Sequence, residues 1–454
     1  MRWGLLSNNA FDRSTAVDAP RAPEATGTVL LATPPAGSTW WPTIEELPRS
    51  AELGAGAARA DETLADHSLA NCAAHSLEPW VDDLFGLEDL AGLCARALPE
   101  EPRLIEVDAR TWILELFHGP TAAFKDTGAR VLASLVRSGL QDVGLPRPSG
   151  RATVIAATTG DTGAAVASAF EGLGELDIVL LYPRGKISAF QERHLCSFGE
   201  SVRAFAVDGD FEDCARIARE TTADERYRGK RWWLPANSVH PLRLLPQAAH
   251  FLWAAQRLKQ KGVGRPAFVV PSGNSGHLTA GLAARAAGLR ASAWLAAHNA
   301  NRGLVDWLST GRFDASATRA TWSNAMDIAA PGNRARLASL LSAESARVEG
   351  VSIDDDGTLR AMAQLQLDHG YAACPHTAVG WAALQERRLQ DPAWQERPAV
   401  LLATAHPAKF EEARRAAGLP LVPLPPALGH LTESSGAAGE ALTGGAEELH
   451  RRLT

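Results

Sequence analysis

From residue 101 onward the sequence repeatedly alternates short apolar runs with helical segments, and this pattern limits the fold to a few classes. Runs such as TWILELF, ATVIAAT, DIVLLY, AFVVP and PAVLLAT are each followed by a segment with helical spacing of its apolar residues. Continuous apolar strands that alternate with helices are typical of parallel sheets covered on both faces. The strands are too many for one modest sheet, so the pattern predicts an α/β protein with two parallel-sheet domains and a cleft between them.

The extent of this pattern sets the expected domain boundaries. Residues 101–140 and 216–425 are expected to form a large domain, and residues 141–215 a smaller one. Residues 1–100 are interpreted as an N-terminal α/β cap, in which TVLLAT is a strand and LEDLAGLCARALPE a helix. The tail at 426–454 is rich in Gly, Ala and Pro, so we expect it to wrap the surface or to be mobile.

Composition and charge argue against several classes of function. The 454 residues carry a formal net charge of −7, which disfavours nucleic acid or an anionic membrane surface as a partner. The five cysteines are odd in number and form no CxxC, so we expect a reducing, cytoplasmic compartment and no disulfide framework. No apolar run is long enough to cross a membrane, and the first residues do not resemble a signal peptide.

Two junctions between a strand and a helix carry glycine-rich turns. The first turn contains Thr158, Thr159, Gly160, Asp161, Thr162 and Gly163, and the second contains Ser272, Gly273, Asn274, Ser275 and Gly276. Glycine lets the backbone approach a ligand closely, and a helix start offers N–H groups and a favourable dipole to an anion. The turns therefore predict two anion sites, although either turn alone is also compatible with a simple capped turn. Neither matches a nucleotide-binding motif.

A third junction places a lysine at the start of a helix. In ELFHGPTAAFKDTGAR an apolar run ends in a tight turn, Thr121 is expected to cap the following helix, and Lys125 lies in its first turn. The helix dipole and partial burial would both lower the pKa of this amine, which suits Schiff-base chemistry. The alternative is a surface lysine, which is the commoner case.

Other polar side chains fall between the expected elements. They are Arg184, Lys186 and Ser188; Asn237, Ser238, His240 and Arg243; Asn324 and Asp327; and Thr404, His406 and Lys409. Isolated histidines such as His118, His376 and His406 are more often packing or surface residues than proton carriers. No HExxH motif or Cys/His spacing supports a catalytic metal.

Taken together and in order, these segments resemble threonine synthase of the long-chain type. The motifs are ELFHGPTAAFKD, TTGDTGAA, LYPRGKIS, ANSVHPLRLLPQ, PSGNSGHLTAG, SNAMDI, PHTAVG and TAHPAKF, which span about residues 101–416. The resemblance implies the tryptophan-synthase-β fold (fold type II) and the cofactor pyridoxal 5′-phosphate. It also implies a lyase of amino-acid biosynthesis that converts O-phospho-L-homoserine and water to L-threonine and phosphate. We expect a cytoplasmic monomer or homodimer without nucleic-acid or membrane partners.

The same resemblance implies roles for individual residues. Lys125 would form the Schiff base with the cofactor, the turn from Ser272 to Gly276 would cradle its phosphate, and Thr404 would meet its pyridine nitrogen. The turn from Thr158 to Gly163 would hold the substrate carboxylate. Candidates for binding the leaving phosphate, which needs fixed cations and donors, are Lys186, Ser188, Asn237, Ser238 and Arg243.

Several positions depart from the family pattern. The family usually reads PSGNFGDLTAG and NSINxxR, where this chain has Ser275, His277 and His240. Cys374 and Arg302 stand where acidic residues are expected, and the N-terminal signature GLAPDGGLYVPE is missing. These changes leave open a divergent paralogue, either a phospholyase or a β/γ-replacement enzyme of specialised metabolism that uses another activated amino acid. A non-catalytic descendant is disfavoured because the lysine and both cofactor-binding motifs are retained.

Overall fold

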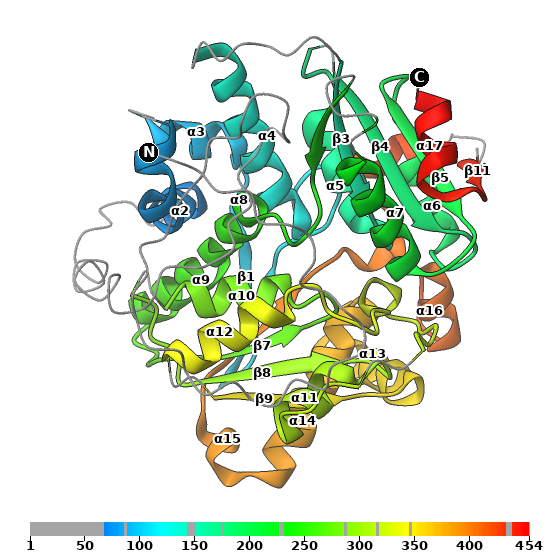
Figure 1. Cartoon of the computed structure of the whole chain (residues 1–454). Coiled ribbons are helices and arrows are strands. Elements are labelled where there is room, and N and C mark those ends of the chain that lie inside the picture. The colour runs from blue at the N-terminus through cyan, green and yellow to red at the C-terminus, as the bar shows by residue number, and fades with distance from the viewer. Residues whose placement is uncertain are drawn as a thin grey trace.

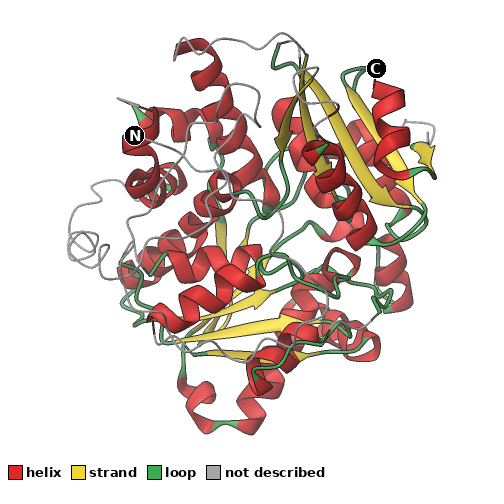
Figure 2. Ribbon diagram, in the orientation of Figure 1, coloured by secondary structure: helices red, strands yellow, loops and turns green. Residues whose placement is uncertain are grey.

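Two mostly parallel sheets organise the part of the chain that the computed structural model describes (Figures 1 and 2). The described residues are 68–85, 89–142, 151–174, 176–224, 226, 231–285, 288–314, 317–344, 347–432 and 438–453. The expected α/β class with two parallel sheets is confirmed. The strand expected at TVLLAT lies outside the described residues.

The larger sheet lies in the lower half of Figure 1 and has the strand order β1-β2-β10-β7-β8-β9. Its strands are β1 (Arg103–Asp108), β2 (Thr111–Glu115), β7 (Ala267–Pro271), β8 (Ala293–His298), β9 (Val348–Ser352) and β10 (Ala399–Ala403). The edge strand β1 is antiparallel to β2, and the other described neighbours are parallel. Their carboxyl ends therefore meet at one edge of the sheet.

Helices cover both faces of the larger sheet. They are α4 (Lys125–Asp142), α8 (Pro241–Leu244), α9 (Ala248–Gln260), α10 (Gly276–Ala283), α11 (Gly303–Thr310), α12 (Arg334–Glu344), α13 (Asp355–His369), α14 (Pro375–Gln390), α15 (Pro392–Glu396) and α16 (Glu411–Ala416), with short 3-10 helices η2 (Leu245–Gln247), η3 (Asn324–Met326) and η4 (Pro407–Lys409). In β7, Phe268 and Val270 share a core with α9 and α10, whereas Val269 shares a core with α14. Because both faces are buried, the strands read as continuous apolar runs.

The described part of the N-terminal region is helical. It consists of α2 (Leu69–Phe85) and α3 (Leu90–Ala97), and α3 confirms the helix expected in LEDLAGLCARALPE. Asp89 caps α3 by accepting a hydrogen bond from the N–H of Gly92. Leu77 and Leu93 are buried in the same core as α4 and α9, so these helices pack against the larger domain.

The smaller sheet has the strand order β11-β5-β4-β3-β6, in which β11 is Glu440–Leu442, and all its described pairs are parallel. Its elements are β3 (Arg151–Ala157), α5 (Asp161–Phe170), β4 (Leu176–Pro183), α6 (Ala189–Leu195), β5 (Val202–Val207), α7 (Phe211–Ala223) and β6 (Arg231–Pro235). The structure differs from the expected boundary at residue 216, because β6 pairs with β3 and buries Trp233 and Leu234. The smaller sheet therefore includes β6, which lies beyond residue 215.

The C-terminal tail, which was expected to wrap the surface or to be mobile, contains regular elements. It forms η5 (Pro426–Thr432), β11 (Glu440–Leu442) and α17 (Gly445–Leu453), and β11 adds an edge strand beside β5 (Figure 1). Leu442, Leu449 and Leu453 complete the core on the face of the smaller sheet that α7 also covers. This apolar side of α17 explains why the tail docks in spite of its Gly- and Ala-rich composition. None of the described helices combines the length and apolar character of a membrane span.

Candidate active site

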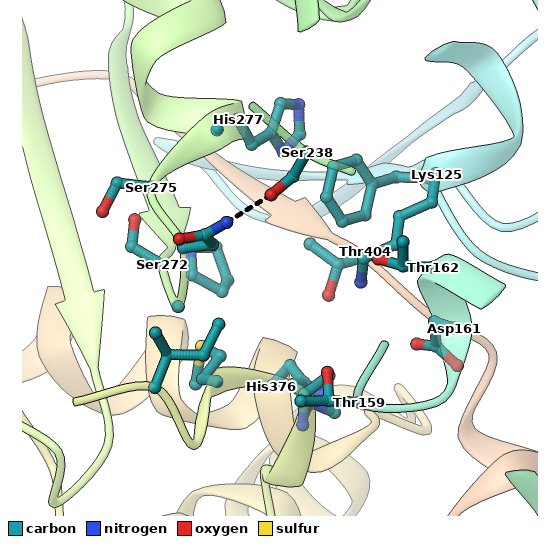
Figure 3. A pocket seen from close by; sticks show the side chains of 18 of the residues that line it. Lys125, Thr159, Asp161, Thr162, Ser238, Ser272, Ser275, His277, His376 and Thr404 are labelled. Atoms are coloured by element: carbon teal, nitrogen blue, oxygen red, sulfur yellow. Dashed lines mark hydrogen bonds between the residues drawn. The ribbon is translucent and has the colours of Figure 1, made fainter. Parts of the chain in front are cut away.

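A cleft lies where the carboxyl ends of the two sheets face each other (Figure 3). The space between its walls is about 770 Å³, part of which is open solvent. The ends of β3, β7 and β10 and the first residues of α4, α5 and α10 line it. Three helix starts therefore converge on one cavity, and each contributes the positive end of its dipole.

Backbone hydrogen bonds fix Lys125 relative to the end of β10. The N–H of Phe124 donates to the carbonyl of Thr404 at 2.9 Å, and the N–H of His406 donates to the carbonyl of Ala122 at 3.1 Å. Ala122 has a φ of 52°, an unfavourable value for alanine, which the surrounding contacts must stabilise. Both Lys125 and Thr404 line the cleft, so this pairing holds the amine and the hydroxyl in a fixed relation.

The turn before Lys125 is organised by an aspartate, and the expected cap is a different interaction. Thr121 donates from its backbone N–H and from its hydroxyl to the carboxylate of Asp126. Thr121 therefore does not cap α4 as expected. It ties the loop before Lys125 to Asp126, in the first turn of α4. Burial raises the pKa of Asp126 to about 6, although both hydrogen bonds from Thr121 act to lower it. The buried carboxylate orders the turn that presents Lys125.

Lys125 has the lowered pKa that its position predicts. Burial is the main cause that lowers the pKa of Lys125 to about 8; the carboxylate of Asp161 opposes this shift, while Arg243 and Lys409 add to it. The ammonium nitrogen lies 4.9 Å from the centroid of the Phe124 ring. An amine with this pKa is partly neutral near physiological pH, so it can act as a nucleophile.

The turn between β7 and α10 has the properties of a phosphate cradle. Ser275 adopts a φ of 58°, in the left-handed region, and its buried hydroxyl has no hydrogen-bond partner in the described part of the chain. A Cβ on Gly273 would lie 2.8 Å from the Cα of Met326, so only glycine fits there. Asn274 is fixed by hydrogen bonds to Ser238 and to the N–H of Gly332. A close backbone, an unpartnered donor and a helix start together fit the phosphate of pyridoxal phosphate.

The turn between β3 and α5 contributes three of its six predicted residues to the cleft. Thr159, Asp161 and Thr162 line the cavity, whereas the Thr158 hydroxyl accepts hydrogen bonds from the N–H groups of Gly160 and Gly163 at 2.9 Å and 2.8 Å. Thr158, Gly160 and Gly163 therefore shape the turn, and Gly160 has a φ of 114° that favours glycine.

Asp161 would repel an anionic substrate if its charge were uncompensated. Its carboxylate lies 2.6 Å from the ammonium of Lys409, and both side chains are buried. Burial acts to raise the pKa of Asp161, but Lys409 holds it well below its usual range. The pair is therefore ionised and neutral overall, and the start of α5 remains available to a carboxylate.

The five residues predicted for the leaving phosphate divide into two groups. Ser238 and Arg243 line the cleft. Lys186 is exposed, Ser188 caps α6 together with Gln191, and Asn237 accepts a hydrogen bond from the N–H of Ala157 at 2.8 Å. These three do not line the cleft. The sequence could not predict this, because it does not specify the direction of a side chain in a loop.

Some residues of the cleft were not among the predicted site residues. They include Phe124, Phe211, Gln247, His277, Met326 and His376. The ring of His376 accepts a hydrogen bond from the N–H of Ala325 at 3.2 Å through Nε2 and lies opposite Lys125 in Figure 3. The motif PHTAVG pointed to the region of His376, but isolated histidines are so often packing residues that the sequence alone did not favour it.

The fold and this cleft define a pyridoxal-phosphate dependent enzyme. The family model with that description matches residues 98–404, and the model for the C-terminal part of threonine synthase matches residues 377–438. The threonine synthase of Serratia marcescens is 39% identical over 318 residues, which cover 69% of this chain and 71% of that protein. The chain belongs to the threonine synthase family, and its cofactor is pyridoxal phosphate.

Solved structures agree with this assignment over most of the chain. The crystal structure of threonine synthase from Escherichia coli superposes with a TM-score of 0.77 at 32% identity and covers 90% of this chain and 92% of that one. The pyridoxal-phosphate-bound threonine synthase from Brucella melitensis gives a TM-score of 0.73 at 26% identity and covers 91% and 92%. The fold of these relatives thus extends over most of the chain.

Proposed function

We propose that this protein is a threonine synthase, which converts O-phospho-L-homoserine and water to L-threonine and phosphate. The observation that carries the proposal is the position of Lys125, an amine of lowered pKa in a cleft that also contains a phosphate cradle and the Thr404 hydroxyl. The similarity to proteins named threonine synthase supports this reaction over others of the same cofactor. When bound, the cofactor supplies an electron sink for the charge that develops beside the substrate amine.

Lys125 has two tasks in this proposal. As a neutral amine it would hold the cofactor through its aldehyde group, and the same nitrogen would move protons at Cα and Cβ of the substrate. A pKa of about 8 suits both tasks, because the nitrogen can accept and release a proton near physiological pH. Ser272 to Gly276 would hold the cofactor phosphate, and the neutral hydroxyl of Thr404 would serve its pyridine nitrogen.

Two further groups of residues would orient the substrate. The Thr159 and Thr162 hydroxyls, at the start of α5, would bind its carboxylate. Arg243 would bind the leaving phosphate: its Nη1 donates to the carbonyl of Ala236 at 3.0 Å, and its buried Nε has no hydrogen-bond partner in the described part of the chain. An unpartnered N–H on a buried guanidinium supports contact with an anionic ligand.

The substrate in this proposal is therefore a phosphorylated amino acid. The cytoplasm is the proposed compartment, since the five cysteines are all free thiols, as expected where the environment is reducing. The expectation of a monomer or homodimer stays a prediction.

Incubation of the purified protein with O-phospho-L-homoserine, with phosphate and amino-acid products assayed together, tests the proposal. We expect equal amounts of phosphate and threonine from the unaltered chain and neither product from Lys125→Ala. Lys261→Ala is a matched control, because Lys261 is an exposed lysine that pairs with Glu106 far from the cleft. Phosphate accompanied by 2-oxobutyrate instead of threonine would contradict the proposal and favour a phospholyase.

A further inference from the structure

A chain of three buried side chains runs from α4 to the cleft. The Thr127 hydroxyl lies 2.9 Å from Nε2 of His250, and Nδ1 of His250 lies 2.9 Å from Nε2 of His277. Thr127, His250 and His277 are 7%, 0% and 4% exposed, so water does not compete for these hydrogen bonds. The chain ends at Nδ1 of His277, which is buried and has no partner in the described part of the protein.

The hydroxyl of Thr127 determines which nitrogens carry protons. No other hydrogen bond of this hydroxyl is found among the described residues, and its hydrogen is satisfied only by donation to Nε2 of His250, so we assign the bond this direction. Burial lowers the pKa of His250 to about 3 and that of His277 well below its usual value, so both rings are neutral and each has one N–H. His250 must then donate from Nδ1 to Nε2 of His277, and the proton of His277 lies on Nδ1. The free end of the chain is therefore a hydrogen-bond donor.

This donor lies beside the phosphate cradle. His277 is in the first turn of α10, directly after the turn from Ser272 to Gly276, and Figure 3 shows its ring among the side chains that line the cleft. The ring stacks on Phe124 with centroids 4.4 Å apart and planes at 15°, which fixes its orientation. The neighbouring Ser275 hydroxyl is also buried and unpartnered in the described structure. Buried donors without acceptors are unfavourable, so an acceptor on a ligand would stabilise both the Ser275 hydroxyl and Nδ1–H of His277.

We propose that His277 is an additional binding residue, which donates its Nδ1–H to an oxygen of a phosphate monoester in the cleft. Thr127 and His250 are positioning residues, which act by holding the proton of His277 on the nitrogen that faces the ligand. The inference rests on the proposed function, because both the cofactor and the substrate carry such a phosphate. An aspartate, which the family pattern has at this position, would repel the same oxygen. The exchange for histidine thus changes repulsion into attraction.

Two binding measurements distinguish the two sources of phosphate. Cofactor-free protein is titrated with pyridoxal 5′-phosphate and with pyridoxal, which lacks the phosphate, and the absorbance of the complex gives both dissociation constants. Cofactor-loaded protein is titrated with inorganic phosphate by calorimetry. The variants are His277→Phe, which retains the stacking on Phe124, Thr127→Val, which retains the volume, and Thr127→Ser, which retains the hydroxyl.

His277→Phe should weaken binding of a phosphate-bearing ligand by about ten- to a hundredfold, which is the effect of one hydrogen bond to a charged group. If the binding of pyridoxal 5′-phosphate weakens while that of pyridoxal is unaffected, the contact is to the cofactor. If the binding of inorganic phosphate weakens, the contact is to the substrate. Thr127→Val should weaken the same ligand to a smaller extent, and Thr127→Ser should behave as the unaltered protein. Thermal unfolding without ligand checks that each variant folds. If His277→Phe does not fold, the phosphate affinity of Thr127→Val tests the proposal.

Unchanged affinity for both phosphate ligands in His277→Phe would overturn the proposal. So would an equal loss for pyridoxal and its phosphate, or a Thr127→Val variant that binds as the unaltered protein does. None of these measurements needs turnover. The product assay therefore fails or succeeds independently of them, and a failure of the threonine synthase reaction is distinguishable from a failure of the His277 contact.

Discussion

The ammonium of Lys409 and the carboxylate of Asp161 form a buried ion pair that joins the two domains. Their atoms lie 2.6 Å apart, and the two side chains are 0% and 3% exposed. Lys409 ends η4 of the larger domain, whereas Asp161 begins α5 of the smaller one. Lys409 also donates to the carbonyl of Thr121 at 3.0 Å, in the turn that presents Lys125. One cation therefore connects both domains to the candidate catalytic residue.

Replacing Lys409 by methionine should lower the free energy of unfolding by about 3 to 5 kcal/mol, because Asp161 would remain buried without its partner. Denaturant unfolding of the cofactor-free protein measures the change. In the double variant Lys409→Met/Asp161→Leu most of this loss should be recovered, since no unpaired charge remains. The exposed pair between Arg415 and Glu411 is a matched control. Arg415→Ala should lower the free energy of unfolding by less than about 1 kcal/mol. An equal loss in Lys409→Met and Arg415→Ala would contradict the importance of burial.

The lowered pKa of Lys125 makes a prediction about stability and pH. Its pKa is about 8 in the folded cofactor-free chain and 10.5 as the ordinary value, so the unfolded chain binds more protons between these limits. The free energy of unfolding therefore rises as pH increases from 8 to 10.5. Below pH 8 the buried amine is charged in the folded chain, and its full destabilising effect is present. Lys125→Met should stabilise the cofactor-free protein by about 1 to 3 kcal/mol at pH 7.

This gain from Lys125→Met should disappear by pH 10.5, the ordinary pKa of lysine, as measured by denaturant unfolding across that range. Lys261→Met, at an exposed position, should show no comparable dependence on pH. A gain of the same size at pH 7 and above pH 10 would indicate an effect of packing instead of charge, and would contradict the lowered pKa.

Arg243 and Lys186 were both predicted to bind the leaving phosphate, but only Arg243 lines the cleft. Arg243→Ala should raise the KM for O-phospho-L-homoserine by at least about tenfold, the minimum expected for a lost charge-assisted contact. Its affinity for pyridoxal 5′-phosphate should change much less. Lys186→Ala should leave both values unchanged. An equal loss of substrate and cofactor affinity in Arg243→Ala would place this guanidinium elsewhere in the mechanism.

The docked tail is testable through one apolar side chain. Leu449 is fully buried between α17 and the smaller sheet, so Leu449→Ala should lower the free energy of unfolding by about 2 to 5 kcal/mol. Glu447→Ala, two residues earlier on the exposed side of the same helix, should change it by less than about 0.5 kcal/mol. Similar values for the two variants would show that the tail does not pack against the sheet in solution.

Much of the site was accessible from the sequence because its determinants are local. The strand before Thr158, the glycine-rich turn before α10 and the lysine at the start of α4 each follow from a short segment read by itself. Buried parallel strands place such turns at the carboxyl edge of each sheet, and the expected cleft between the two sheets then predicts that they converge. The lowered pKa of Lys125 followed from the same local features, and the structure adds Arg243 and Lys409 as further causes.

The features that sequence reasoning missed depend on contacts between distant segments. Nothing within Arg231–Pro235 specifies that β6 pairs with β3, since either sheet could bury its apolar side chains. The direction of Lys186, in a loop, is likewise undetermined by its neighbours in sequence. Thr127 and His250 are 123 positions apart, so their hydrogen bond and its effect on His277 emerge only when α4, α9 and α10 are packed together.

The most direct test of the central claim is to find which amine binds the cofactor. The purified protein, loaded with pyridoxal 5′-phosphate, is reduced with borohydride and digested, and the modified peptide is located by mass spectrometry. We expect a pyridoxyl group on Lys125, together with loss of the Schiff-base absorbance band in Lys125→Ala. Modification of another lysine, with the band retained in Lys125→Ala, would contradict this claim.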